Sequence, residues 1–502
     1  MDQGYPLIRL DRWFAERAMH FSGLKEESSL SKALAQLMAS ARRGDLCLPL
    51  VDVQEGAQRL LEEEERLSSF IRIDRGNVYL EKNWVIERML EKEIRRLTEN
   101  KSSIFNEEDH LQRGLLNEQQ RQAIAICLEN RLTLLTGGPG TGKTFTAAAI
   151  VESFDRKGEK RIVLAAPTGK AAEHLEQSVF KASGRHLPSA TLHKWLQLGG
   201  SPPWPKENFA LDADLLLVDE CSMIDAPLFA TLLKAIPTHC NTILMGDPNQ
   251  LSPIGSGSVF TDLVSSSHFL MGKAQLTKSM RAENQQILLM AEAVLQAKIP
   301  KDLIVPWPDS EKAFYCYLTS ALPSQPGEST EKKPDPEELF ERLSRKKMLN
   351  CLRQGPFGAD AVNQFFLEKV RKDARMDQWW WMPIMITSND ERTGLSNGEM
   401  GIYMQRQGDR ASGVAYFSKK RQEITLMALP SYEPAFCTSV HKSQGTEYDE
   451  VLVIVPIGSE NFGREMLYTA ITRARQKVSL LVQEEVLSSM VGKSLVKHSG
   501  IL

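Results

Sequence analysis

The stretch TLLTGGPGTGKTFTAA, residues 133–148, decides the fold of this 502-residue chain. Its apolar start predicts a buried strand, its alanine-rich end predicts a helix, and a glycine-rich loop joins the two. The loop satisfies G-x-x-x-x-G-K-[ST], a pattern whose backbone N–H groups and helix N-terminus hold phosphate oxygens. The residues predicted to bind a nucleoside triphosphate are Gly137, Gly138, Pro139, Gly140, Thr141, Gly142, Lys143 and Thr144.

Short apolar runs surround this loop and alternate with helical stretches. The first set is RLTLLT, RIVLAAPT, ADLLLVDE and NTILMGD, and a second set is MPIMITSND, CTSVHKS, EVLVIVP and VSLLVQEE. Runs that are apolar throughout and end at polar turns are typical of strands buried on both faces of a parallel sheet. The sequence therefore predicts an α/β fold with two domains, each built on a parallel sheet.

Three other regions differ in composition from these sets. Residues 1–106 are rich in Leu, Glu and Arg at helical spacing, which predicts a small N-terminal helical domain. That domain is either a plain accessory or a docking surface for another subunit, and the sequence leaves both open. Residues 322–338 are rich in Pro and charge and indicate an exposed loop or linker. Residues 401–430 alternate polar and apolar side chains and predict a small β-insertion.

The bulk composition limits the class of protein. Hydrophobic residues make up 42% and charged residues 25%, as in a soluble globular protein, and the length suggests several domains. The start, MDQGYPLIRLDRWFAER, lacks the apolar core of a signal peptide, and no long apolar run predicts a membrane span. The seven cysteines show no metal spacing, so we expect reduced thiols and a cytoplasmic protein. With a net charge of −3, any nucleic-acid path must be a local groove.

Two acids follow the run LLLV at the expected carboxyl end of a strand, where α/β sheets place ligands. Asp219 can hold Mg²⁺, and Glu220 can orient and deprotonate an attacking water. An ordinary solvated acid pair at a strand end is the alternative, but a phosphate-binding loop upstream favours the functional interpretation. The expected cofactors are therefore ATP and Mg²⁺.

A phosphate-binding loop with paired acids occurs in kinases, transporters, GTPases and motors, and three further stretches narrow this choice. Gln250, in GDPNQL, ends another strand and can sense the γ-phosphate. Arg281, in LTKSMR, and Arg473, in LYTAITRAR, lie in the second half of the chain. Arginines supplied by a different domain make hydrolysis depend on closure of that domain. A surface ion pair is the alternative for each arginine.

Several stretches together resemble the ordered motifs of superfamily 1 helicases, and especially the RecD branch. They are APTGKAA at 166–172, LVDECSMID at 217–225, GDPNQLSPIGSGSVF at 246–260, VHKSQGTEYDEV at 440–451 and REMLYTAITRAR at 464–475. LRQGPFGADAVN at 352–363, PIMITSNDERTGLSNGEMGI at 383–402, CLPL at 47–50 and VYLEKNWVIER at 78–88 are similar to the RecD family itself. The resemblance covers nearly the whole chain.

The resemblance implies an architecture and several residue roles. It implies one RecA-like motor domain at 107–265 and another at 266–400 and 431–502. It also implies a short pin near 196–211, an SH3-like insertion at 401–430, and partner docking by residues 1–106. Gln120 resembles the glutamine that reads adenine, Gln250 the γ-phosphate sensor, and Glu447 the acid near the ribose. Arg281 and Arg473 resemble the arginines that close on ATP. LTKSMRA lacks the aromatic that often precedes that arginine, so Arg281 matches less well.

Polar residues that follow strand ends suit a path that grips phosphates without reading sequence. The resemblance implies contacts with single-stranded DNA at Thr168, Lys170, Thr191, His193, Ser439, His441 and Lys442. For His193 the alternative is a helix cap or a core histidine. Bases could stack on Trp195, Trp204 or the WWW run at 379–381, although a tryptophan run at a strand start is more typical of core.

These features together predict an ATP-dependent 5′→3′ DNA helicase or translocase on single-stranded DNA. The resemblance implies a heterotrimer with RecB-like and RecC-like subunits that acts on duplex DNA ends in double-strand break repair and homologous recombination; the polarity comes from the resemblance alone. We see no nuclease motif, so nuclease activity should come from a partner. A stand-alone helicase is an alternative, which the short N-terminal region argues against. A nucleotide-dependent scaffold is another, which the matching Lys143, Glu220 and Arg473 argue against.

Overall fold

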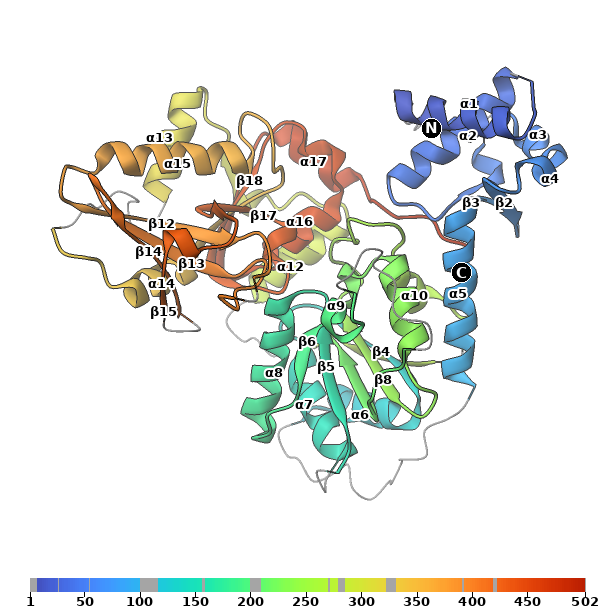
Figure 1. The fold of residues 1–502 in the computed structure, drawn as a ribbon, viewed down its shortest axis with the longest axis horizontal. Helices are drawn as coiled ribbons and strands as arrows, with labels where there is room; N and C mark the ends of the chain where they lie inside the picture. Colours follow the sequence, from blue (N-terminus) through green and yellow to red (C-terminus); the bar gives the residue numbers. More distant parts are fainter. Residues whose placement is uncertain are drawn as a thin grey trace.

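A computed structural model gives the structure of the chain. It describes residues 7–25, 27–53, 55–99, 116–155, 159–198, 209–269, 271–278, 285–321, 331–390, 392–418 and 422–501. Figure 1 shows an N-terminal part, two α/β parts side by side, and an antiparallel sheet at the far end of the second α/β part. Among the described helices, none combines the length and apolar character that crossing a membrane requires.

The first α/β domain has a six-stranded parallel sheet of order β6-β5-β7-β8-β4-β9. Its strands are β4 (Leu132–Gly137), β5 (Ile162–Ala166), β6 (Ser189–Thr191), β7 (Leu215–Val218), β8 (Asn241–Gly246) and β9 (Gly272–Leu276). Its helices are α6 (Glu118–Glu129), α7 (Lys143–Phe154), α8 (Gly169–Ser183), α9 (Leu192–Trp195), α10 (Ala226–Ala235) and α11 (Val259–Ser265). The four runs predicted as its strands are confirmed. Because β7, β8 and β4 are neighbours, the loops that follow them meet at one edge.

The second α/β domain has a five-stranded parallel sheet of order β10-β19-β18-β11-β17. Its strands are β10 (Ile304–Pro306), β11 (Lys346–Asn350), β17 (Cys437–Ser439), β18 (Tyr448–Val455) and β19 (Ala474–Val482). Its helices are α12 (Gln285–Leu295), α13 (Glu311–Ala321), α14 (Pro336–Arg345), α15 (Ala359–Asp373), α16 (Arg464–Ile471) and α17 (Glu484–Gly492). Helix α14 begins within the stretch predicted as a linker, where the Asp335 carboxylate accepts from the N–H of Glu337 at 2.9 Å.

One strand prediction is wrong. The run MPIMITSND lies on β12 (Trp379–Ile386), which pairs antiparallel and is no part of the parallel sheet. The antiparallel sheet has the order β15-β14-β13-β12-β16, with β13 (Met400–Arg406), β14 (Asp409–Phe417), β15 (Gln422–Thr425) and β16 (Tyr432–Pro434). Its strands therefore extend on both sides of the insertion predicted at 401–430. An apolar run alone does not reveal which partner strand it meets, since both faces of β12 are buried here too.

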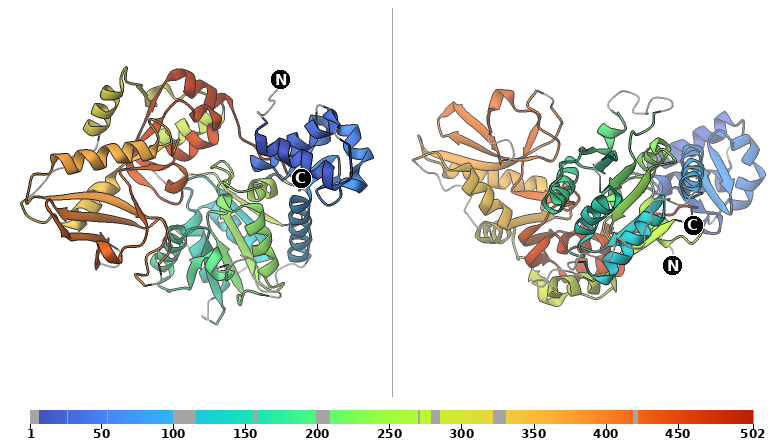
Figure 2. Two further views of the ribbon diagram at one scale, coloured as in Figure 1. Left: turned by 45° about the horizontal axis from the view of Figure 1, so that its top comes forward. Right: turned by 90° about the horizontal axis from the view of Figure 1, so that it is seen from below.

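The N-terminal part contains α1 (Arg9–Phe21), α2 (Ser28–Arg42), α3 (Ala57–Glu62), α4 (Glu64–Leu67) and the long α5 (Glu81–Thr98). It also contains a small antiparallel sheet of β1 (Cys47–Pro49), β3 (Asn77–Leu80) and β2 (Ile71–Asp74), which the helical reading missed. Helix α5 runs beside α10 (Figures 1 and 2), and Leu90, Ile94 and Leu97 share a core with α10 residues. This helix therefore joins the N-terminal part to the first α/β domain.

Candidate functional site

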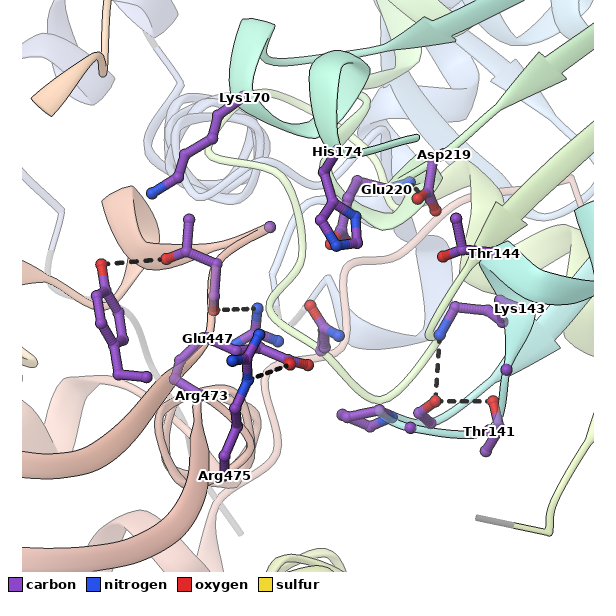
Figure 3. A pocket seen from close by; sticks show the side chains of 18 of the residues that line it. Thr141, Lys143, Thr144, Lys170, His174, Asp219, Glu220, Glu447, Arg473 and Arg475 are labelled. Atoms are coloured by element: carbon purple, nitrogen blue, oxygen red, sulfur yellow. Dashed lines mark hydrogen bonds and ion pairs between the residues drawn. The ribbon is translucent and has the colours of Figure 1, made fainter. Parts of the chain in front are cut away.

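The loop between β4 and α7, predicted as a phosphate cradle, joins a strand to a helix as its sequence predicts. Gly140 and Gly142 have φ of +74° and +84°, a conformation that favours glycine and turns the backbone into the helix. The Lys143 ammonium donates hydrogen bonds to the carbonyl oxygens of Gly137, at 2.6 Å, and Gly138, at 3.2 Å. Figure 3 shows Lys143 and Thr144 on the same side of the cavity, below Asp219.

Two acids stand beside this cradle at the end of β7, of which Asp219 is buried and Glu220 is partly buried. The N–H of Glu220 donates to Oδ1 of Asp219 at 2.8 Å, and Glu220 has a left-handed φ of +53°. Such a conformation is unusual for a non-glycine residue and is typical of functional sites. Burial raises the pKa of Asp219, which Lys143 opposes. Burial and then the Asp219 carboxylate raise the pKa of Glu220, while Arg473 and Lys143 oppose this shift.

The loop after β8 supplies a third group. Gln250 is buried, and its Nε2 lies 3.5 Å from Oδ2 of Asp247. Its Oε1 is buried and has no hydrogen-bond partner among the residues that the structure describes. A buried amide oxygen without a donor is costly, so this atom is suited to accept a bond from a ligand or its water.

The second α/β domain provides the opposite wall. Arg473, between α16 and β19, is 3% exposed. Its Nε donates to the carbonyl of Thr469 at 3.0 Å and its Nη1 to the carbonyl of Thr446 at 3.3 Å. These bonds fix the guanidinium at the cavity (Figure 3). Next to it, Arg475 forms an ion pair with Glu447 at 3.3 Å.

The two walls touch each other at several points. The Tyr468 hydroxyl donates to Oδ2 of Asp247 at 2.8 Å, and the N–H of Leu251 donates to Oγ1 of Thr469 at 2.9 Å. A methyl group placed on Gly445 would lie 3.8 Å from Oε1 of Glu220. Between the walls is a cavity of about 600 Å³. The cradle, the acids and Gln250 line it from one domain, and residues 445–448 with Arg473 and Arg475 line it from the other.

Several residues of this cavity were missed by sequence reasoning. Helix α8 contributes Glu173, His174 and Gln177, together with Lys170. Their spacing of three or four residues places them on one helical face, a signal that could have identified them from Lys170. Burial lowers the pKa of Lys170 to about 8. Lys170, predicted as a DNA contact, therefore lies at the cavity that also holds the phosphate cradle.

One predicted nucleotide residue, Gln120, stands apart from the cavity lining. Gln120 is fully buried in α6, where its Oε1 accepts from the N–H of Asn117 at 3.1 Å. Its Nε2 is buried with no partner among the described residues, and Gln120 is absent from the lining of the cavity. Arg281 lies outside the described residues, as does Trp204 and most of the predicted pin near 196–211.

The predicted DNA contacts form two groups. Thr168 and Thr191 lie near one another, because β5 and β6 pair in parallel, and each hydroxyl caps a helix. His193 on α9 is exposed. Ser439 ends β17, and beyond it the His441 ring packs on Phe462 and Lys442 forms an ion pair with Glu433 at 2.6 Å. A separate set of side chains therefore lies at the strand ends of each parallel sheet.

Three of the tryptophans predicted as stacking candidates, Trp195, Trp380 and Trp381, pack in or against the core. Trp380 and Trp381 are 2% and 3% exposed, as the core interpretation of the WWW run expects. The indole N–H of Trp195 donates to the carbonyl of Leu164 at 2.9 Å, and its ring packs against the core of the first domain. Trp380 and Trp381 are therefore too deeply buried to stack on bases.

The sequence of this chain is similar to those of helicases and helicase subunits. Residues 115–304 match the model of an AAA domain, and residues 434–481 match that of a UvrD-like helicase C-terminal domain. The RecBCD enzyme subunit RecD of Mycolicibacterium smegmatis is 30% identical over 424 residues, which cover 76% of this chain and 74% of that protein. RecD of Haemophilus influenzae is 27% identical, covering 76% and 71%.

A third relative is a helicase whose name states its activity. The ATP-dependent RecD2 DNA helicase of Deinococcus radiodurans is 29% identical over 380 residues, which cover 72% of this chain and 48% of that protein. The crystal structure of the Pif1 helicase from Candida albicans aligns with 77% of this chain and 97% of its own, at 16% identity and a TM-score of 0.47.

Proposed function

We infer the function from one premise: this chain belongs to the RecD family of superfamily 1 helicases. It is an ATP-dependent DNA helicase. We propose that it moves 5′→3′ on single-stranded DNA and works as one subunit of a heterotrimer with RecB-like and RecC-like chains at duplex ends. The observation that carries the motor mechanism is the shared cavity, in which Lys143 and Glu220 come from one domain and Arg473 from the other.

In this proposal the cradle binds the triphosphate of ATP. Its backbone N–H groups and the N-terminus of α7 hold phosphate oxygens, and Lys143 exchanges its carbonyl partners for the β- and γ-phosphates. Thr144 and Asp219 would hold Mg²⁺, which neutralises phosphate charge. They fit that ion because a hydroxyl and a buried carboxylate face the same part of the cavity (Figure 3), and a hard cation prefers oxygen ligands.

Glu220 acts as the general base for hydrolysis. Because its pKa is raised, the Glu220 carboxylate is a stronger base than an ordinary glutamate and is better suited to take a proton from water. The unpartnered Oε1 of Gln250 accepts a hydrogen bond from the same water and so orients it. Arg473 stabilises the charge of the transferring phosphoryl group, a contribution of about 10³–10⁵ in rate when supplied from a second domain.

Motion follows because the walls belong to different domains. The bonds Tyr468–Asp247 and Leu251–Thr469 join them at the loop that carries Gln250. Contacts of Gln250 and Arg473 with ATP would add to this junction, and loss of the γ-phosphate would remove them. The strand-end residues Thr168, Thr191 and His193 on one sheet, and Ser439, His441 and Lys442 on the other, would grip the DNA backbone in turn. Alternating grip converts closure into directed steps.

Strand-displacement with matched overhangs tests this function. The purified chain, alone and with RecB-like and RecC-like partners, receives duplexes that carry either a 5′ or a 3′ single-stranded overhang. We expect ATP-dependent unwinding of the 5′-overhang duplex and little of the 3′ one. Preference for the 3′ overhang would overturn the polarity. ATP turnover that single-stranded DNA fails to stimulate would instead favour a nucleotide-dependent scaffold.

A further inference from the structure

The segment after α17, residues 493–501, links all three parts of the molecule. Figure 1 shows it leaving α17 and running to the N-terminal part, with the chain end beside α5. Its first residues contact α16. There the N–H of Arg464 donates to the carbonyl of Lys493 at 2.9 Å, and the Ser494 hydroxyl donates to Glu465 at 2.6 Å. Helix α16 also carries Tyr468 and leads to Arg473.

The far end of the segment is fixed to the N-terminal part and to the first α/β domain. The N–H of Leu46 donates to the carbonyl of His498 at 2.8 Å, and the N–H of Gly500 donates to Glu87 at 2.9 Å. The Ser499 hydroxyl donates to Asp262 of α11 at 2.8 Å. Ile501 is 2% exposed within the core that α5 and α10 share. The segment therefore crosses from one motor domain to the other.

Lys497 is the side chain in the middle of this crossing. Its ammonium donates to the carbonyl oxygens of Pro253 and, at 2.5 Å, Gly255. A methyl group on Gly44 would lie 2.8 Å from its Cε and Nζ, so the side chain is clamped against the N-terminal part. The carbonyl of Gly44 in turn accepts from the N–H of Gly257 at 2.7 Å. Burial lowers the pKa of Lys497, which Asp45 and Asp225 oppose.

The loop that Lys497 holds is the one that follows Gln250. Thr469 of α16 binds the N–H of Leu251 at the start of this loop, and Lys497 binds two carbonyls a few residues later. The nucleotide-facing loop is thus fixed at two points, and both come from the C-terminal part of the chain. Burying an ammonium costs free energy unless its N–H groups are hydrogen-bonded. Because the carbonyls of Pro253 and Gly255 supply those bonds, the loop is held in the one position that satisfies Lys497.

We propose that Lys497 is a positioning residue for ATP hydrolysis. It holds the carbonyls of Pro253 and Gly255 so that Gln250 and Asp247 keep their places at the cavity, and it ties that loop to Gly44 of the N-terminal part. This role rests on the proposed function, because it acts through the groups assigned there to hydrolysis.

The test uses the full chain with Lys497→Met, Lys497→Arg and Gly44→Ala. Val496→Ala is the matched control, since Val496 is the neighbour in the same segment and is 71% exposed. ATPase stimulated by single-stranded oligo(dT) gives kcat and KM, and hydrogen exchange of the peptide 246–257 without nucleotide reports the loop directly. Thermal unfolding confirms that each variant is folded.

We expect Lys497→Met to lower kcat roughly three- to tenfold with little change in KM for ATP. Exchange within 246–257 should become faster, Lys497→Arg should recover part of both effects, and Val496→Ala should match the parent. Gly44→Ala should act in the same direction as Lys497→Met, because its methyl would meet both the ammonium and, at 3.0 Å, the Gly255 carbonyl that the ammonium holds, at a backbone φ of +98°. If Lys497→Met does not fold, the Gly44→Ala result decides.

Unchanged exchange in 246–257 for the folded Lys497→Met variant would overturn the positioning role, whatever the ATPase shows. Equal loss in Val496→Ala would also overturn it, since the effect would then belong to the segment as a whole. Absence of DNA-stimulated ATPase in the parent chain would instead count against the proposed function, while the exchange result would still decide whether Lys497 holds the loop at 246–257 in place.

Discussion

The hydroxyl of Tyr468 donates a 2.8 Å hydrogen bond to the carboxylate of Asp247, although 221 residues separate the two in the sequence. Tyr468 lies on the helix that leads to Arg473, and Asp247 starts the loop that contains Gln250. Burial, and then the Asp247 carboxylate, raise the pKa of Tyr468, so its hydroxyl stays protonated and acts as a donor. This bond joins the domain that carries Arg473 to the loop that contains Gln250.

Replacing Tyr468 with Phe should weaken that link without removing any group predicted to touch ATP. We expect kcat of the DNA-stimulated ATPase to fall about three- to tenfold, because one hydrogen bond to a charged acceptor is lost, while KM changes less. Tyr432→Phe, in the antiparallel sheet, serves as the control. Identical steady-state kinetics in both variants would show that the bond does not contribute to hydrolysis.

The cradle lysine gives the simplest prediction. Lys143→Ala removes the ammonium that holds the loop carbonyls and is predicted to reach the phosphates, so ATP turnover should be abolished. Binding of single-stranded DNA, measured by fluorescence anisotropy without nucleotide, should remain. Turnover equal to that of the parent would refute the assignment of the cradle.

The acid pair predicts a pH dependence. Because burial and Asp219 raise the pKa of Glu220, the rising limb of kcat/KM should lie above the ordinary glutamate value of about 4.3. Activity is lost below that limb, since a protonated Glu220 cannot accept a proton. Glu220→Gln should lower kcat by roughly 10²–10⁴ and keep ATP binding. If a weakly active Glu220→Gln variant showed the rising limb of kcat/KM at the same pH, the titration would belong to another group.

Arg473 and its neighbour Arg475 should separate in their effects. Arg473→Ala should reduce kcat far more than it raises KM, because its guanidinium is predicted to act on the transition state. Arg475, paired with Glu447 at 3.3 Å, should mainly affect KM for ATP when replaced by Ala. Full steady-state curves for the two variants measure this. An equal loss of kcat and ATP affinity in Arg473→Ala would exclude a role for Arg473 in stabilising the transition state.

Asp262, which accepts a hydrogen bond from Ser499 in the 493–501 segment, should make the stability of the protein depend on pH. Burial, with Glu87 of α5 nearby, raises its pKa to about 6, and the Ser499 hydroxyl opposes the shift. The folded state therefore favours the neutral acid, and that stabilisation is lost as pH rises through about 6. Asp262→Asn should be more stable than the parent at pH 8, on the order of 1–3 kcal/mol, and the gain should shrink toward pH 5. Thermal melts at both pH values measure this, and a gain independent of pH would contradict it.

The phosphate cradle and the strands of the first sheet followed from sequence because their determinants are local. A strand that is apolar throughout, a glycine loop and a Lys-Thr pair at a helix start specify their own geometry within residues 133–148. The place of the acids at 219 and 220 at the end of β7 was predicted for the same reason, since polar residues after a buried run mark the carboxyl edge of a sheet.

Tertiary structure decided what depends on partners distant in sequence. The run at 379–386 is as apolar as a parallel strand, yet it pairs antiparallel with β13 and β16, because pairing is set by neighbouring strands and not by the run itself. The face of α8 at the cavity, the Tyr468–Asp247 bond and the clamp on Lys497 were equally hidden. Local sequence fixes backbone conformation and burial over a few residues, whereas contacts between domains arise only when the whole chain has packed.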